Sequence, residues 1–448
     1  MRAMVVPHDA TANSINVWLG LTDVDQPPEN LQLEVAKVRS VPIDSNAWRL
    51  VDAEGGLQPG DSRTFVQTVT VEGLAAHQAH ALTFVDAVAR ASTLPRELPT
   101  DPLRPLTVLL SSCFAMEQAA GELNASIDGI DAQSPIDLKF LCGDQVYLDF
   151  PGFILGGLLS DRRAAKTFHS RYVRNWTDRG GYERLLSLGS SWFTCDDHEF
   201  WNNYPNRAAQ IPRTWTQGGR DALTSMERSL FEDFQRATNP KAVNRRFSVG
   251  ELSFMVSDTR LERAPGDDRF MGDQDFRALI DWCQTLPGPG VLVVGQPLFT
   301  EPTGLLGKIK DLALPDYRQY VTLVDAMTNA PHSILILTGD VHFARVAKAT
   351  MPTTAATDIF EVIASPIALV AGKPGKTETP PDFFPAKGVD TQHRGPTQVV
   401  AAPKTAGNNV ATLQFRSASG QVHVDVTHWL LTRSGARKDP DTVQITLR

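Results

Sequence analysis

The segment Phe140-Leu141-Cys142-Gly143-Asp144-Gln145-Val146-Tyr147-Leu148-Asp149 begins with apolar residues and continues into polar ones. A short apolar run bounded by a turn signal is typical of a buried strand. Gly143 allows the backbone to turn sharply where the strand ends. The segment therefore predicts a buried strand that delivers reactive side chains to its carboxyl end.

Three other short apolar runs end in the same way. Residues 107–110 lead into Ser112-Cys113, residues 192–195 into Asp196-Asp197-His198-Glu199, and residues 334–337 into Gly339-Asp340-Val341-His342. Further strands are expected at 254–256 and 291–294, and helices at 161–172, 221–238, 274–286 and 317–327. This alternation predicts a layered α/β domain. Ligands of open α/β sheets bind outside the carboxyl ends of the strands, so the four clusters are expected to converge.

Each cluster taken alone has a structural alternative. Gly-Asp after a strand is usually a turn, and a single cysteine such as Cys113 is commonly a small buried residue. Asp196 and Asp197 could cap the following segment. The occurrence of all four clusters at strand ends favours function. Carboxylates gathered at one edge repel one another unless they are protonated or neutralised by a cation, so the sequence predicts a metal centre.

The side chains in these clusters narrow the choice of metal. Carboxylates and Asn offer hard oxygen ligands, His342 offers imidazole, and Cys113 and Tyr147 offer thiolate and phenolate. A phenolate and a thiolate together suit ferric iron better than Mg²⁺, and Zn²⁺ is plausible for the Cys, His and Asp subset. Asp144 could bridge two ions of a polynuclear site.

The N-terminal part of the chain has a different pattern. Short apolar runs and period-two alternation up to residue 84 predict a β-sandwich over residues 1–95. Prolines between 95 and 105 predict a stiff linker at 96–105. The catalytic domain is then expected at 106–448, with residues 372–398 as a long surface loop that could cover a site. Runs at 412–416 and 422–426 predict a hairpin near the C-terminus.

Composition excludes some classes of function. The 448 residues carry a formal net charge of −8, which argues against a nucleic-acid coat or a polybasic membrane contact. No apolar run approaches membrane-spanning length. The four cysteines lack CxxC spacing and the N-terminus lacks a signal pattern, so a cytoplasmic location is expected. A mature exported form would have the same sequence.

The clusters resemble the PhoD-like (alkaline phosphatase D) family of the metallophosphoesterase superfamily. The resemblance rests on Ser-Cys at 112–113, Gly-Asp-Gln-Val-Tyr at 143–147, Asp-Asp-His-Glu with Asn-Asn at 196–203, and Gly-Asp-Val-His at 339–342. Further similar motifs are Ser-Asp-Thr-Arg at 257–260, Gly-Gln-Pro-Leu at 295–298, and Glu361 ahead of Ala364-Ser365-Pro366. The resemblance implies a layered αββα sandwich preceded by an immunoglobulin-like or fibronectin-like β-sandwich domain.

The resemblance also implies a set of metal ligands. Fe³⁺ would be held by Cys113, Asp144 and Tyr147. Ca²⁺ beside it would be held by Asp144, Asp197, Asn203 and Asp340, with His342 near the cluster. Asp196 is an alternative to Asp197, and Asn202 to Asn203.

The implied activity is hydrolysis of a small-molecule phosphoester, of phosphodiesterase or alkaline phosphatase type. A metal-bound hydroxide would attack phosphorus in line. His198 is the candidate acid for the leaving alkoxide, unless it only orients a ligand. Arg260 could hold a phosphate oxygen, or pair with a carboxylate such as Asp258.

Two other functions fit the same sequence. A Zn²⁺ or Mn²⁺ metallophosphoesterase could act on another ester. A β-domain adhesion or scaffold protein could carry a catalytically degenerate form of the fold. Metal content and turnover of a generic phosphodiester distinguish these alternatives from the iron and calcium enzyme.

Overall fold

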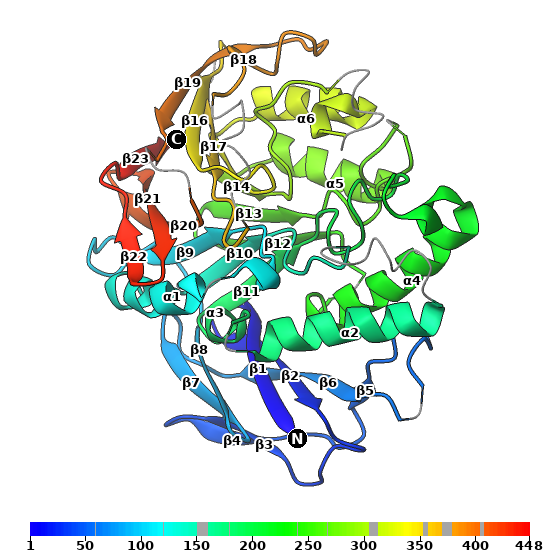
Figure 1. Cartoon of the computed structure of the whole chain (residues 1–448). Helices are drawn as coiled ribbons and strands as arrows, with labels where there is room; N and C mark the ends of the chain where they lie inside the picture. The colour runs from blue at the N-terminus through cyan, green and yellow to red at the C-terminus, as the bar shows by residue number, and fades with distance from the viewer. Residues whose placement is uncertain are drawn as a thin grey trace.

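The structure is a computed structural model that describes residues 1–58, 60–119, 121–149, 160–178, 180–239, 241–266, 268–303, 312–352, 357–369, 379–403 and 407–448. Two large sheets occupy its centre, and a pair of smaller sheets lies at one end (Figure 1). The fold is a mixed α/β fold rich in sheet, as the alternation of strands and helices predicts.

The first large sheet has the strand order β11-β10-β9-β20-β21-β22, and β23 also pairs with β21. Its strands are β9 (Leu106–Ser111), β10 (Leu138–Cys142), β11 (Ser190–Thr194), β20 (Asn409–Ala418), β21 (Gln421–Thr432), β22 (Gly435–Lys438) and β23 (Val443–Leu447). The three strands β9, β10 and β11 are parallel, so their carboxyl ends lie at one edge. The predicted C-terminal hairpin is β20–β21, and β20 is antiparallel to β9.

The second large sheet has the order β12-β13-β14-β15-β17-β16-β19-β18. Its strands are β12 (Asn244–Val249), β13 (Leu252–Ser257), β14 (Gly290–Val293), β15 (Ile334–Thr338), β16 (Arg345–Thr350), β17 (Asp358–Ile363), β18 (Phe383–Phe384) and β19 (Gly395–Ala401). The middle strands β13, β14, β15 and β17 are parallel. They are almost entirely buried and mostly apolar because both of their faces are covered.

The two sheets share one apolar core, and helices cover their outer faces (Figure 1). Val108 and Phe140 of the first sheet belong to the same buried cluster as Phe254 and Leu335 of the second. On the first sheet lie α1 (Glu122–Gln133), α2 (Asp161–Thr177), α3 (Glu183–Leu186) and α4 (Gln217–Phe234). On the second lie α5 (Asp273–Gln284) and α6 (Arg318–Thr328). The layers therefore run helix, sheet, sheet, helix.

The N-terminal residues form two four-stranded antiparallel sheets. One has the order β1-β2-β6-β5, with β1 (Arg2–Ala10), β2 (Ser14–Thr22), β5 (Arg49–Leu50) and β6 (Thr64–Glu72). The other has the order β4-β3-β7-β8, with β3 (Gln32–Val35), β4 (Arg39–Pro42), β7 (Ala79–Phe84) and β8 (Ala87–Ser92). Both contribute to an apolar cluster that also contains residues of the two large sheets, so a separate β-sandwich domain over residues 1–95 stays a prediction. An immunoglobulin-like or fibronectin-like class stays a prediction.

The N-terminal sheets also pack directly against the helices of the first large sheet. Trp18 on β2 donates a hydrogen bond from Nε1 to the carbonyl of Asp233 at the end of α4, over 2.8 Å.

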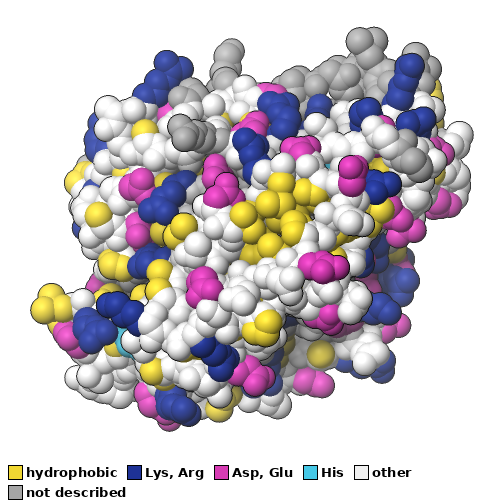
Figure 2. Space-filling view, turned by 90° about the horizontal axis from the view of Figure 1, so that it is seen from below, with side chains coloured by type: hydrophobic (Ala, Val, Ile, Leu, Met, Phe, Trp, Pro, Cys, Tyr) yellow, Lys and Arg dark blue, Asp and Glu magenta, His cyan; other side chains and the backbone are white. Residues whose placement is uncertain are grey.

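The face seen from below in Figure 2 carries a central hydrophobic patch, and Lys and Arg are interspersed there with Asp and Glu. This face therefore presents no extended field of one sign.

One predicted segment differs in the structure. Residues 372–378 of the surface loop expected at 372–398 lie outside the described residues. Its described part contains β18 and the first residues of β19, and β19 pairs with β16. No helix among the described residues is both long enough and apolar enough to span a bilayer.

Candidate metal centre

The carboxyl ends of β9, β10 and β15 bring three of the predicted ligands together. The Sγ atom of Cys113 lies 3.5 Å from Oδ2 of Asp144 and 3.5 Å from the backbone oxygen of Asp340. Cys113 and Asp144 follow neighbouring parallel strands of the first sheet, whereas Asp340 follows a strand of the second. The expected convergence at the strand ends is therefore present, and it joins both sheets.

Five of the predicted ligands have a left-handed backbone, with φ between 55° and 78°: Cys113, Asp144, Asn203, Asp340 and His342. A positive φ is uncommon for residues other than glycine and costs free energy. Such conformations persist where the surrounding structure enforces them, and they cluster at active sites. The recurrence of one unusual conformation at five converging positions favours a functional site.

The two glycines of the Gly-Asp motifs serve different purposes. Gly143 has a φ of 80°, and a Cβ atom there would lie 2.6 Å from Cβ of Asp196. Gly339 has no such φ, but a Cβ atom there would lie 2.2 Å from the side chain of Ser112. Gly143 is thus needed for the turn, as expected, whereas Gly339 is needed because β9 and β15 approach each other closely.

The carboxylates form two overlapping groups that could each hold an ion. Ligand atoms of Asp144, Asp197 and His198 lie within 4.8 Å of one another, and so do those of Asp144, Asp196 and Asp340. Asp144 belongs to both groups, which suits a bridging ligand. Burial raises the pKa of Asp144 well above its usual value; Asp197, Asp196 and Glu199 raise it further, although His198 opposes them. The site therefore needs positive charge to keep Asp144 ionised.

Asn203 provides independent support for a cation. Its backbone N–H donates to Oδ2 of Asp197 over 2.7 Å. Its side-chain oxygen is buried and has no hydrogen-bond partner. A buried polar atom without a partner is costly, and an amide oxygen is a good ligand for a hard cation. The residues present therefore fit a metal.

Tyr147 and Cys113 also contact Asp144. The hydroxyl of Tyr147 lies 3.2 Å from Oδ2 of Asp144, and its ring stacks on His198 with 4.2 Å between centroids. Burial, followed by the charge of Asp144, raises the pKa of Tyr147 well above its usual value, and the same two causes act on Cys113. Both groups would need a highly charged cation to bind as anions.

His198 makes a short contact that the sequence did not reveal. Its Nδ1 lies 2.7 Å from Oδ1 of Asp149, and its Nε2 lies 3.9 Å from Oδ1 of Asp197. Burial lowers the pKa of His198, but Asp149, Asp197 and Asp144 outweigh it and raise the pKa well above the ordinary value. Asp149 ends the segment 143–149 that follows β10, and its place in that segment was the available signal.

His342 is near the cluster but outside both carboxylate groups. Its backbone N–H donates to Oγ of Ser365 over 3.2 Å. His342 is exposed to solvent, although the protein atoms around its ring, with the charge of His198 as a second cause, lower the pKa of its imidazole. A neutral imidazole is the form that binds metals.

Arg260 is placed differently from a phosphate-binding residue. Its side chain is 0% exposed, and its Nε donates to Oδ1 of Asp196 over 2.6 Å. Asp258 instead accepts backbone N–H groups of Cys195, Arg260 and Leu261. The geometry favours the ion-pair alternative, with Asp196 as the partner in place of Asp258.

Glu199 holds the two turns that carry candidate ligands. Its carboxylate accepts the backbone N–H groups of Asp144, Gln145 and Asp196 over 2.9, 2.5 and 3.0 Å. Since these residues follow β10 and β11, one buried carboxylate ties two ligand-bearing turns together. The sequence shows Glu199 within its motif but gives no sign of this role.

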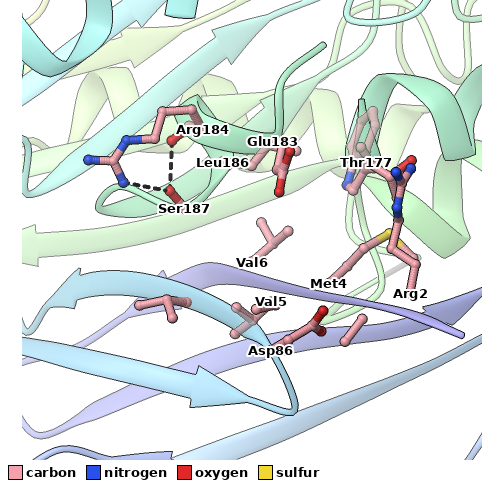
Figure 3. Close-up of a pocket in the computed structure, with 14 residues that line it drawn as sticks. Arg2, Met4, Val5, Val6, Asp86, Thr177, Glu183, Arg184, Leu186 and Ser187 are labelled. Carbon is pink, nitrogen blue, oxygen red and sulfur yellow. Dashed lines mark hydrogen bonds between the residues drawn. The ribbon is translucent and has the colours of Figure 1, made fainter. Parts of the chain in front are cut away.

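A cavity of about 510 Å³ lies away from the metal centre, between the start of β1, the turn before β8, and α3 (Figure 3). Met4, Val5 and Val6 are apolar residues of its lining, and Arg2, Asp86 and Glu183 are charged ones. None of the described residues that line it is a candidate ligand.

Comparison with known proteins supports the fold of this chain. No protein-family model matches the sequence, and no curated protein matches it. Among solved structures, a purple acid phosphatase from seeds of yellow lupin (Lupinus luteus) has a similar fold, with a TM-score of 0.54 and 13% identity. The match covers 99% of this chain and 73% of the lupin chain. The chain therefore has the fold of a known phosphatase.

Proposed function

We propose that this protein is a metal-dependent phosphoester hydrolase of the PhoD-like phosphodiesterase or alkaline phosphatase type. The observation that supports it most is the convergence of Asp144, Asp197 and Asp340 with Cys113 and Asn203 at the strand ends. The fold likeness to a phosphatase agrees with this proposal.

The proposed ligands divide between two ions. Cys113, Asp144 and Tyr147 would hold Fe³⁺, and Asp144, Asp197, Asn203 and Asp340 would hold Ca²⁺, with His342 beside them and Asp196 as the alternative to Asp197. The bound cations would lower the pKa of water and neutralise charge on the phosphoryl oxygens. Zn²⁺ or Mn²⁺ is the alternative metal content.

His198 is the proposed general acid. Asp149 holds Nδ1, which directs Nε2 towards Asp197 and the carboxylate cluster. Asp149, which is not a proposed metal ligand, is the largest cause that raises the pKa of His198, so it favours a proton on the ring for transfer to a leaving alkoxide. Asp149 orients the imidazole and stabilises its charged form. Arg260 fixes Asp196 and takes no direct part.

The remaining expectations are proposals about context. Residues 1–95 would be a β-sandwich domain, 96–105 a linker and 106–448 the catalytic part. The substrate would be a small phosphoester and not nucleic acid, since the formal net charge is −8. The location would be cytoplasmic, which the four cysteines without CxxC spacing favour.

The experiment is hydrolysis of bis(p-nitrophenyl) phosphate and p-nitrophenyl phosphate by the purified protein. Activity should disappear after chelator treatment and return when metal is restored. Metal loading without turnover on either ester would favour the catalytically degenerate scaffold. Turnover that depends on Zn²⁺ or Mn²⁺ but not iron would favour the second alternative.

A further inference from the structure

Residues 143–149, here called the ligand loop, carry Asp144, Tyr147 and Asp149. Side chains of helix α2 contact the backbone carbonyls of this loop and not the side chains of the proposed ligands. Nη1 of Arg171 donates to the carbonyl oxygens of Tyr147 and Leu148 over 2.5 and 2.8 Å. One turn further on, Nδ2 of Asn175 donates to the carbonyl of Gln145 over 2.8 Å.

These contacts fix the part of the loop that most needs fixing. Asp144 has a left-handed backbone, and the carbonyls held by α2 belong to the residues after it. A strained conformation persists only where its surroundings enforce it. Loop carbonyls that lie away from a strand ladder also need donors. Arg171 and Asn175 supply three such hydrogen bonds from a rigid helix.

The opposite side of α2 is held by the N-terminal sheet. Residues 169 and 171 point about 200° apart on a helix of 3.6 residues per turn. His169 is buried, and its Nε2 lies 2.9 Å from Oγ1 of Thr64 on β6. Nearer the start of the helix, Lys166 donates to Asp61 over 3.1 Å. The helix therefore lies between the N-terminal sheet and the ligand loop.

We propose that α2 clamps the metal centre: Arg171 and Asn175 are positioning residues that hold the ligand loop, and the N-terminal sheet holds α2. The clamp deepens the proposed function and rests on it for its effect on metal binding. The N-terminal sheets are then part of the catalytic assembly, not a separate attachment.

The test compares the wild type with Arg171→Met, which removes the donors but keeps the aliphatic stem. Arg171→Lys keeps a charged donor, and Arg163→Met makes the same change at an exposed arginine of α2. Hydrogen exchange of the ligand loop is followed by mass spectrometry in chelator-treated protein. Metal retention is measured in untreated protein by elemental analysis after dialysis against graded EDTA.

Arg171→Met should speed hydrogen exchange of the ligand loop about tenfold. It should also lower the EDTA concentration at which half of the metal is lost by about tenfold, which is the lower end of the range of affinity losses for residues that support metal ligands. Arg171→Lys should recover most of both effects, and Arg163→Met should match the wild type. Thr64→Val should speed loop exchange to a smaller extent. Unchanged loop exchange in Arg171→Met overturns the clamp, and unchanged exchange in Thr64→Val overturns the role of the N-terminal sheet.

The two proposals fail separately. If the wild type holds no metal but Arg171→Met still loosens the loop, the clamp stands and the proposed function is wrong. If the wild type holds metal and Arg171→Met changes neither exchange nor retention, the clamp is wrong and the function stands.

Discussion

Both oxygens of Asp149 are engaged with the segment that follows β11: Oδ1 lies 2.7 Å from Nδ1 of His198, and Oδ2 accepts the backbone N–H of Asn202 over 2.7 Å. Asp149 is thus placed to orient His198 and to hold the turn next to it.

Asp149→Asn should lower kcat by about 10- to 100-fold for an ester with a weakly acidic leaving alcohol. Because Asp149 raises the pKa of His198, the substitution should lower that pKa. The protonated acid is then lost at lower pH, so the alkaline limb of the kcat profile should move to lower pH. A p-nitrophenyl ester, which needs less help from an acid, is the control. Equal loss on both esters would contradict the acid role of His198.

Asp144 should destabilise the metal-free protein as the pH rises. Burial, then Asp197, Asp196 and Glu199, raise the folded-state pKa of Asp144 above its unfolded value of about 3.9. Folding therefore favours the protonated form, and stability falls as the pH rises from the unfolded pKa through the folded one. With chelator present, Asp144→Asn should weaken this dependence and melt above the wild type at pH 8. Identical melting of the two proteins at pH 5 and pH 8 would exclude the repulsion.

Tyr147→Phe should remove a visible absorption band. A ferric–phenolate pair absorbs by charge transfer, so the purified protein should be coloured if the iron proposal holds. The hydroxyl lies 3.2 Å from Oδ2 of Asp144, and loss of that hydrogen bond should cost about 1 kcal/mol of stability. Iron bound stoichiometrically with an unchanged spectrum and rate in the variant would rule out the phenolate ligand.

Arg260→Met should mainly reduce stability. Removing one partner of a buried ion pair costs about 3–5 kcal/mol because the other charge is left unpaired. Arg260 and Asp196 are 0% and 1% exposed. The double variant Arg260→Met, Asp196→Asn should recover part of the loss, as measured by urea unfolding. A large rise in KM without loss of stability would instead restore the phosphate-binding role.

Local patterns predicted much of the α/β core. The strands before Cys113, Asp144, Asp196 and Asp340 are confirmed as β9, β10, β11 and β15, and the four predicted helices are α2, α4, α5 and α6. Helix α4 begins earlier than expected because Thr216 caps it by accepting the N–H of Gly219. These elements were predictable because each is strongly apolar or strongly periodic along its own sequence.

Elements with weak local patterns were missed. Strand β1 contains Pro7 and the buried His8, which do not look like a strand, yet β1 is an edge strand, where proline is tolerated. Helix α1 buries only Leu123, Ser126, Ile127 and Ile130. The pairing of β20 with β9 joins residues far apart in sequence, and no local pattern specifies such a partner.

The site was predictable as a set of residue types but not as a set of contacts. Acidic residues after buried strands indicated where carboxylates would gather. The sequence could not indicate that Arg260 would be buried against Asp196, or that Glu199 would bind three backbone N–H groups. The contact of Arg260 depends on the distance between the two sheets, and that of Glu199 on the pairing of β10 with β11, which only the folded chain defines.

The most direct test is the metal content of freshly purified wild-type protein and of Asp144→Asn, by elemental analysis. The carboxylates of Asp144, Asp197 and Asp340 are expected to hold about one metal ion or more per chain, because a cation is needed to offset their mutual repulsion. Asp144→Asn should lose that metal together with hydrolytic activity. A wild-type protein that hydrolyses phosphoesters without metal, or an Asp144→Asn variant with full metal and full activity, would contradict a metal centre at these strand ends.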